Sequence, residues 1–218
     1  AFDHFDAIQV ISKYQYNEML EIKFKNNLKI KIFKSKYQFI NKQIESYENK
    51  KADTDLLIAP SWNSGFYKLS CHIILRDLLN KNNISYKFRP HPMSFNKKEI
   101  TEKELIDLKI PLDLSSFFNP YKYNFFITDW SGIFIEYALI LKRKAYLINT
   151  PKKMANEEYL EFKNQPVEIN LRNKIGKTFA IEKIENIIID IIDIKNNNID
   201  LVLPEDSSVK KLIEDNFY

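Results

Sequence analysis

The sequence predicts an α/β fold in which a parallel sheet carries helices on both of its faces. Short apolar runs rich in β-branched residues alternate with amphipathic stretches along most of the chain, as in strands joined by crossover helices. The clearest junction covers residues 125–138. There an apolar run ends at a group of turn formers and N-cap residues, and apolar residues then return at helical spacing. This stretch is predicted to be strand, tight turn and helix.

Residues 1–52 are interpreted as the tail of a preceding domain followed by a linker helix. Residues 7–11 form an apolar run and residues 28–33 alternate lysine with apolar side chains, so both are predicted strands. Helices are predicted over residues 12–22, with Ser12 as the N-cap, and over the charged residues 37–51. The chain begins without a methionine, which indicates a piece of a longer protein.

Residues 53–218 are predicted to form a second domain that contains the main sheet. The expected strands are residues 55–60, 84–88, 125–128 and 145–148, with a short extended segment at 110–114. The expected helices are residues 69–79, 97–108, 181–194 and 208–216, and one that begins at Ser131. On the helix at 69–79 the inward side chains are predicted to be Ile73, Ile74, Leu78 and Leu79.

The composition excludes several classes of protein. Of the 218 residues 44% are apolar, enough for a real core, and the net charge of +4 comes from lysines interleaved with glutamates, so no nucleic-acid partner is expected. Cys71 is the only cysteine, which excludes an intrachain disulfide and fits a reducing compartment. No apolar run approaches the roughly 20 residues of a membrane-spanning helix. Heavy use of Asn, Lys and Ile indicates an AT-rich genome.

The unusual residues of the sequence fall where the predicted strands end. In a Rossmann-like parallel sheet, ligands bind outside the carboxyl ends of the strands. Four of these ends carry polar, charged or aromatic side chains: at Ser61 and Trp62, at Arg89 and His91, at residues 128–132 and at residues 149–152. Their convergence on one edge of the sheet predicts a binding site.

The junction at residues 128–132 suits a phosphate group. The start of the following helix offers N–H groups and the positive end of a helix dipole, and Gly132 has no side chain to keep a phosphate away. Glu136 lies one helical turn further on, where a carboxylate could accept from two hydroxyls of a ribose. The alternative is an ordinary β–α junction of a parallel sheet.

Arg89 and His91 are the predicted catalytic residues. Arg89 carries a planar, permanently charged guanidinium group, which suits a phosphate. Its alternative role is a surface salt bridge. His91 lies between two prolines and could donate to a diphosphate oxygen or protonate a leaving group. Its alternative role is a turn histidine bonded to a backbone carbonyl. With three histidines, one cysteine and no well-placed Asp-x-Asp pair, no metal is expected.

Other polar residues near the strand ends have structural alternatives. Asp129 would repel a phosphate, so it is predicted to cap the helix or face a hydroxyl group. Trp130 is predicted to pack in the core or to form a wall of the site, rather than to stack against a ligand. Glu168 and Arg172 are four residues apart, which predicts one helical salt bridge. Three residues after the last strand end could line the cleft: Lys152, Lys153 and Asn156.

Three ordered motifs resemble the CDP-glycerol glycerophosphotransferase family of teichoic-acid and capsule polymerases. They are Ile-Ala-Pro-Ser-Trp at 58–62, Arg-Pro-His-Pro at 89–92, and Thr-Asp-Trp-Ser-Gly with Glu-Tyr-Ala at 128–138. The resemblance covers residues 55–176 and implies the C-terminal, nucleotide-binding domain of a two-domain GT-B transferase. A further set looks like a bacterial surface-polysaccharide branch of the family: Pro151, Lys153, Asn156, Tyr159, Glu168, Arg172 and Gly176.

By this resemblance, the chain binds a nucleotide-activated donor such as CDP-glycerol. It would transfer an alditol phosphate or a sugar to a polysaccharide or lipid-linked acceptor of a capsule, teichoic acid or lipopolysaccharide, with no cofactor. The resemblance implies a cytoplasmic protein at the inner face of the plasma membrane, with peripheral membrane contact. The implied roles are Arg89, His91, Ser131 and Gly132 at the donor diphosphate and Glu136 at the ribose, with Ser61, Trp62, Thr128 and Asp129 completing the donor site.

Two departures from the family pattern bear on function. The family commonly has Tyr-Ser-Ser where this chain has Trp130-Ser131-Gly132, which implies a different donor. The Trp-His-Gly motif of the family's N-terminal half, which supplies the acceptor-side base, is absent. The chain is therefore expected to bind a donor but to catalyse poorly without the missing N-terminal half.

Two other functions remain open from the sequence. The Ser-Gly…Glu turn also resembles that of GT-B UDP-GlcNAc 2-epimerases, so an epimerase-like enzyme or a UDP-sugar glycosyltransferase would prefer uridine ligands. A non-enzymatic α/β scaffold or receiver-like domain would bind no nucleotide, and substitution of Arg89 would cause it no loss of function. The acidic cluster that a receiver domain needs at its strand ends is not evident.

Overall fold

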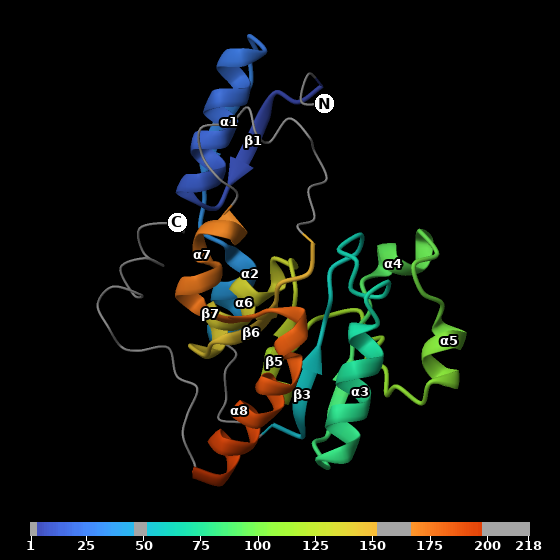
Figure 1. Cartoon of the computed structure of the whole chain (residues 1–218). Helices are drawn as coiled ribbons and strands as arrows, with labels where there is room; N and C mark the ends of the chain where they lie inside the picture. The colour runs from blue at the N-terminus through green and yellow to red at the C-terminus, as the bar shows by residue number, and fades with distance from the viewer. Residues whose placement is uncertain (1–3, 46–51, 152–166, 198–218) are drawn as a thin grey trace. The chain divides into compact units, whose positions relative to one another are not determined.

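The computed structural model describes residues 4–45, 52–151 and 167–197 (Figure 1). The chain divides into two compact units. Unit 1 comprises Ala1–Tyr47, Met154–Asn170 and Pro204–Tyr218, and unit 2 comprises Glu48–Lys153 and Leu171–Leu203. The predicted helix at 208–216 lies outside the described residues.

Unit 1 contains a small β–α–β arrangement followed by a helix. Its elements are β1 (Ala7–Val10), α1 (Lys13–Lys25), β2 (Lys31–Lys34) and α2 (Gln38–Glu45). β1 and β2 pair in parallel, with Ile8 opposite Ile32. The predicted N-cap of α1 is confirmed, because the Ser12 hydroxyl accepts a hydrogen bond from the Gln15 N–H at 3.2 Å.

The predicted strand at 28–33 begins three residues too early. α1 continues to Lys25, and Asn27 then adopts a left-handed conformation (φ 49°). The N–H of Leu28 bonds back to the carbonyl of Lys23 at 2.9 Å, so Leu28 closes the helix rather than starting a strand. The predicted helix at 37–51 is described as far as Glu45.

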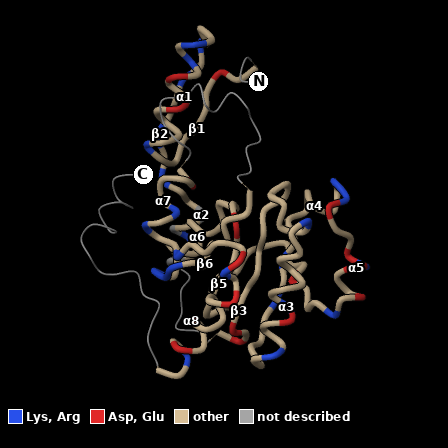
Figure 2. Tube along the Cα trace, viewed as in Figure 1, with Lys and Arg blue, Asp and Glu red and all other residues tan. Residues whose placement is uncertain are grey.

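Unit 2 is built on a five-stranded sheet in the order β4-β3-β5-β6-β7. Every neighbouring pair is parallel, which confirms the predicted α/β class. No charged residue occurs in β5 or β6 (Figure 2), as expected of strands covered on both faces. The strands are β3 (Thr54–Ile58), β4 (Tyr86–Phe88), β5 (Tyr123–Thr128), β6 (Ala145–Ile148) and β7 (Gly176–Phe179).

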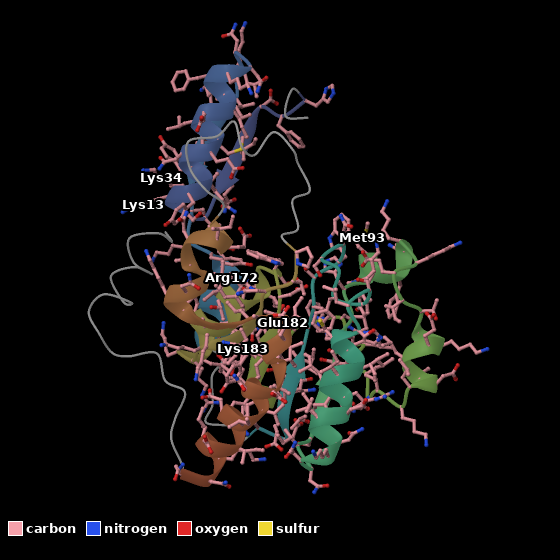
Figure 3. All side chains as sticks on the ribbon, viewed as in Figure 1. Lys13, Lys34, Met93, Arg172, Glu182 and Lys183 are labelled. Atoms are coloured by element: carbon pink, nitrogen blue, oxygen red, sulfur yellow. The ribbon has the colours of Figure 1, made fainter. Side chains whose placement is uncertain are left out.

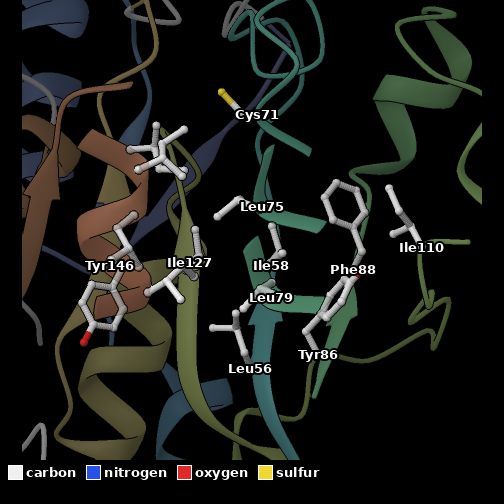
Figure 4. Packing of buried hydrophobic residues seen from close by; sticks show 14 of the residues in the cluster. Leu56, Ile58, Cys71, Leu75, Leu79, Tyr86, Phe88, Ile110, Ile127 and Tyr146 are labelled. Carbon is white, nitrogen blue, oxygen red and sulfur yellow. The ribbon is translucent and has the colours of Figure 1, made fainter. Parts of the chain in front are cut away.

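Helices cover both faces of this sheet. On one face α3 and α8 pack side by side, and Figure 4 shows Leu75 and Leu79 of α3 close to Leu56 and Ile58 of β3. On the other face Tyr137 of α6 stacks on Phe126 of β5 with ring centroids 5.0 Å apart. The helices are α3 (Cys71–Lys81), α4 (Pro92–Asn96), α5 (Glu102–Asp107), α6 (Ile133–Leu141), α7 (Val167–Ile175) and α8 (Ile184–Asn197).

Two predicted helices of unit 2 need correction. α3 begins at Cys71 rather than residue 69, and it turns Cys71, Leu75 and Leu79 inward while the predicted core residue Ile74 is 38% exposed. The helix expected at 97–108 is shorter, because α4 ends at Asn96 and α5 covers only Glu102–Asp107. The chain turns left-handed at Lys98 (φ 56°), and α5 starts afresh at Thr101 with a complete capping box to Glu104.

α7 and β7 are not among the helices and strands that the sequence predicts. β7 pairs with β6 and begins directly after α7, with Gly176 opposite Ala145. A Cβ added at Gly176 would lie 2.3 Å from Leu147 Cδ1 and 2.8 Å from the carbonyl oxygen of Arg172. Only glycine therefore lets the chain pass from α7 into the sheet at this point.

The strand order reverses its direction between β3 and β5. From β3 the chain steps to β4 on one side, and it then crosses back to β5 on the other side and continues outward to β6 and β7. A crevice forms outside the carboxyl ends of the two strands at such a topological switch point, and ligands of open parallel sheets bind there. The loops after β3 and β5 are therefore the first place to look for a site.

Replacing Gly176 by alanine is expected to destabilise unit 2 by about 1–3 kcal/mol, the usual penalty for overpacking. The added methyl group must displace either Leu147 or the Arg172 carbonyl. Chemical denaturation followed by circular dichroism measures the difference. Gly132→Ala is the control, because Gly132 is exposed with φ −60° and ψ −14°, which alanine adopts without strain. Equal stability of the two variants would contradict the close packing at Gly176.

Candidate functional site

Asp129 joins three strand ends at the topological switch point. It directly follows β5 and is fully buried. Its Oδ1 accepts a hydrogen bond from the backbone N–H of Ser61, beyond β3, at 2.7 Å. Its Oδ2 accepts from the hydroxyl of Thr150, beyond β6, at 3.3 Å. The hydroxyl that Asp129 faces is thus that of Thr150, within the protein. The Asp129 carboxylate links the ends of β3, β5 and β6.

Thr128 and Ser61 lie buried beside this carboxylate. The Thr128 hydroxyl donates to the carbonyl of Ala59 at 2.6 Å and so adds a second link between the ends of β5 and β3. Ser61 is only 2% exposed, and its hydroxyl has no hydrogen-bond partner among the described residues. A buried hydroxyl that lacks a partner is uncommon, and here it lies at the crevice where a ligand would bind.

Arg89 lies at the carboxyl end of β4 and is engaged by a neighbouring loop. Its Nη1 donates to the Ser115 hydroxyl at 3.0 Å and lies 3.4 Å from Oδ2 of Asp113. The salt bridge considered as its alternative role is therefore present, with both side chains less than one-fifth exposed.

The pKa of Asp113 is lowered in the folded protein. Burial acts to raise this pKa, but hydrogen bonds from the Ser115 hydroxyl and N–H and from the Tyr123 hydroxyl, together with the charge of Arg89, outweigh it. Asp113 is thus held ionised beside Arg89.

His91 caps the short helix α4. Its Nδ1 accepts a hydrogen bond from the N–H of Met93 at 3.1 Å (Met93 is labelled in Figure 3), whereas the alternative role considered for it was a turn histidine bonded to a backbone carbonyl. An Nδ1 that accepts carries no proton, so the proton of the neutral ring lies on Nε2. The ring of Trp62 lies 6.4 Å from the His91 ring, so the ends of β3 and β4 meet at these two side chains.

The start of α6 presents the remaining predicted residues. Gly132 is the N-cap and is exposed, and it has no side chain to cap the helix, while the N–H groups of Phe134 and Ile135 donate to the carbonyls of Ser131 and Gly132. Ser131 and Glu136 are partly exposed, and Glu136 lies in the first turn. Ser131 and Gly132 come two and three residues after Asp129, which places the positive end of α6 next to the switch point.

Arg172 has a different role at this site from the one that its sequence position predicts. The predicted helical salt bridge between Arg172 and Glu168 is wrong. Arg172 is only 4% exposed, and it donates to the carbonyls of Asp129 and Ile148 and to Oδ1 of Asn149. Its guanidinium carbon lies 4.0 Å from the ring centroid of Trp130. The Trp130 Nε1–H donates to the carbonyl of Thr150 at 2.8 Å.

Other reactive side chains near the sheet are held inert. Burial raises the pKa of the Cys71 thiol to about 11, and the charge of Asp129 acts in the same direction, so the thiol is protonated at neutral pH. Burial, followed by the charge of Arg76, lowers the pKa of His72, against the charge of Glu104. His72 is therefore a neutral core residue that packs edge-on against Tyr67.

Some predicted features concern residues that the structure does not describe, namely Lys152, Lys153, Asn156 and Tyr159. Within residues 4–45, 52–151 and 167–197, no group of three or more His, Cys, Asp or Glu side chains could hold a metal ion. Over the same ranges none of the helices combines the length and the apolar character needed to cross a bilayer.

Comparison with known proteins gives a distant structural likeness. No protein-family model and no curated protein matches the chain. A crystal structure of the UDP-GlcNAc 2-epimerase of Methanocaldococcus jannaschii, in complex with UDP-GlcNAc and UDP, is similar with a TM-score of 0.48 and 14% sequence identity. The match covers 96% of this chain and 60% of that one. A likeness at this level carries no argument about function, and the glycerophosphotransferase resemblance stays a prediction.

Removing the carboxylate of Asp129 is expected to destabilise the protein strongly. Asp129→Ala leaves the Ser61 N–H and the Thr150 hydroxyl without their acceptor, which predicts a loss of about 2–4 kcal/mol in the free energy of unfolding. Asp129→Asn keeps an acceptor for Ser61 and should lose about 1 kcal/mol. Urea denaturation measures both, with the exposed Asp107→Ala as a control. If Asp129→Ala behaves like Asp107→Ala, Asp129 does not connect the strand ends.

The lowered pKa of Asp113 predicts a pH-dependent contribution to stability. A carboxyl group whose folded pKa lies below its unfolded value stabilises the protein fully above the unfolded pKa of about 4 and loses that effect as the pH falls further. Urea denaturation of wild type and Asp113→Asn is compared from about pH 7 down to about pH 2. The stability difference should be constant down to about pH 4 and then shrink. If the difference in unfolding free energy between the two proteins is the same at every pH, the interactions of Asp113 do not stabilise its ionised form.

Proposed function

We propose that unit 2 binds the diphosphate of a nucleotide-activated donor at the carboxyl ends of β3, β4 and β5. The observation that carries this proposal is the topological switch point between β3 and β5, where the buried hydroxyl of Ser61 has no partner among the described residues and the Ser61 N–H donates to Asp129, three residues before the N-cap of α6. In this role unit 2 is the donor-binding half of a GT-B transferase, whose acceptor-side half precedes it in the whole protein.

The negative charge of Asp129 does not oppose this role. Both carboxylate oxygens accept hydrogen bonds from within the protein, and the side chain is fully buried. The N–H groups of Phe134 and Ile135 donate to the carbonyls of Ser131 and Gly132, so the donors proposed for the phosphate are the N–H groups of Gly132 and Ile133 at the positive end of α6. Glu136, one turn into α6, is the acceptor for the ribose hydroxyls.

Arg89 and His91 supply the donors for the rest of the diphosphate. The Arg89 fork carries five N–H donors, and the two described contacts use only its Nη1. His91 has its proton on Nε2, which is the tautomer that donates to a phosphate oxygen. Both residues therefore neutralise charge that develops on the leaving nucleotide.

The proposed reaction is attack of an acceptor hydroxyl on the activated donor. With a CDP-alditol donor the hydroxyl oxygen bonds to the distal phosphorus, the phosphoanhydride bond breaks, and CMP leaves. The hydroxyl proton goes to a base supplied by the preceding half of the protein. The transferred alditol phosphate extends a bacterial surface glycan, and the reaction takes place at the inner face of the plasma membrane.

A UDP-sugar is the second candidate donor, for a glycosyltransferase or an epimerase-like enzyme. The specific observation in its favour is the Trp130-Ser131-Gly132 turn, because Ser-Gly followed by Glu136 departs from the Tyr-Ser-Ser of the glycerophosphotransferases. The base of the nucleotide therefore decides between the two enzyme classes.

Calorimetric titration of this chain with CDP-glycerol, CDP, CMP, UDP-GlcNAc and UDP tests the proposal. A nucleoside diphosphate should bind, and Arg89→Ala or His91→Ala should each weaken binding by about 1.5–3 kcal/mol, the contribution of a charged hydrogen bond. Tighter binding of cytidine ligands supports the glycerophosphotransferase class, and tighter binding of uridine ligands supports the UDP-sugar enzymes.

Matched controls are available for both substitutions. Arg76→Ala removes an arginine of α3 that pairs with Asp77, and His4→Ala removes an exposed histidine of unit 1. Neither should change nucleotide binding. If no ligand of the panel binds the wild-type chain or a longer chain that includes the preceding half, the donor-site proposal is wrong and the scaffold alternative gains support.

A further inference from the structure

Arg172 connects the carboxyl ends of β5 and β6 from outside the sheet ladder. It lies near the end of α7, where its Nη2 donates to the carbonyl of Ile148 at 2.8 Å and its Nη1 to the carbonyl of Asp129. Nε and Nη2 both reach Oδ1 of Asn149, at 3.2 and 3.0 Å. One planar fork thus satisfies acceptors on two adjacent strand ends (Figure 3 labels Arg172).

The same guanidinium fixes the orientation of Trp130. Its carbon lies 4.0 Å from the centre of the indole ring, within the range of a cation–π contact. The edge of the ring is held separately, because the Trp130 Nε1–H donates to the carbonyl of Thr150 at 2.8 Å. Trp130 is therefore held by its face and by its edge, and it is the residue immediately before Ser131 and Gly132 at the start of α6.

Pairing of the two strands alone does not explain a buried charge at this place. β5 and β6 already pair in register, with Ile127 opposite Tyr146 and Thr128 opposite Leu147. Burial lowers the pKa of Arg172 to about 10, against the charge of Asp129, so the side chain is charged at neutral pH while its described hydrogen bonds all go to neutral oxygens. Buried charges are expensive ways to stabilise a fold, and their best-attested benefit is to specify one arrangement.

We propose that Arg172 is a positioning residue that holds Trp130 and the Ser131–Gly132 turn in the orientation in which the start of α6 meets the donor diphosphate. This inference rests on the proposed function for its ligand, but the geometry of the turn can be measured without any ligand. Lysine cannot replace arginine here, because a single ammonium group cannot both reach the strand-end carbonyls and lie flat on the indole ring.

The two tryptophans of the chain make the turn directly observable. Trp62 and Trp130 are the only ones, so a Trp62→Phe background leaves Trp130 as the single indole reporter. Acrylamide quenching and the emission maximum of Trp130 are measured with and without Arg172→Lys, at a temperature where circular dichroism shows both proteins folded. Arg172→Lys should raise the quenching constant of Trp130 and shift its emission to longer wavelength. A role in stability alone would lower the melting temperature and leave both signals of the folded state unchanged.

Nucleotide binding is measured in parallel in the Trp62-containing chain. There Arg172→Lys should weaken binding of the preferred nucleoside diphosphate about tenfold, in line with the loss of a desolvated cation–π contact. Arg76→Lys is the matched control and should change neither the fluorescence nor the affinity. Arg172→Met, which removes the cost of burying a charge, is studied beside the lysine variant so that the test does not depend on one variant folding.

The two readouts separate the two proposals. If a folded Arg172 variant leaves the quenching and emission of Trp130 unchanged, Arg172 does not position the turn, whatever the nucleotide affinity. If the Trp130 signals change but wild type binds no nucleotide, the positioning role stands and the donor-site proposal fails. If the Trp130 signals change and affinity for the nucleotide does not, the turn is positioned but does not meet the diphosphate, which overturns the inference as stated.

Discussion

The hydrogen bond from the Ser61 N–H to the carboxylate of Asp129 is the interaction on which the site depends. It crosses the gap between the ends of β3 and β5 at the point where the strand order reverses, and the sheet ladder has ended there. Because Asp129 also accepts from Thr150, one buried carboxylate determines how far apart three loops can be. Every group proposed to contact the donor lies on one of those loops or next to one.

This arrangement resolves an electrostatic difficulty that the sequence raises. A carboxylate adjacent to a phosphate site repels the ligand unless its charge is satisfied elsewhere. Here the two carboxylate oxygens point at a backbone N–H and a hydroxyl, and the guanidinium of Arg172 lies close enough to influence them. The charge of Asp129 is therefore met by buried groups of the protein itself.

The sheet and the convergence of polar residues at its strand ends were predictable because they depend on local patterns. Apolar runs such as residues 125–128 and 145–148 mark central strands wherever they occur, and the turn at 128–132 marks a helix start. β7 was missed because Gly-Lys-Thr-Phe has no apolar pattern of its own, and its place is set by pairing with β6.

Arg172 could not be located from the sequence for a similar reason. Its spacing from Glu168 suggests an exposed pair on a helix, whereas its actual acceptors lie 24 and 43 positions away along the chain. The same holds for Arg89, whose partner Asp113 belongs to a loop beyond two further helices. Contacts of a buried cation depend on long-range packing, which local patterns do not contain.

The left-handed residues that end several helices have a consequence beyond geometry. Asn27 and Lys98 are two of seven described non-glycine residues with positive φ, in a chain that has only three glycines. Each such lysine carries a backbone strain of about 1 kcal/mol that a glycine would not. The folded chain therefore keeps strain at these turns, and a glycine introduced at Lys98 would release it.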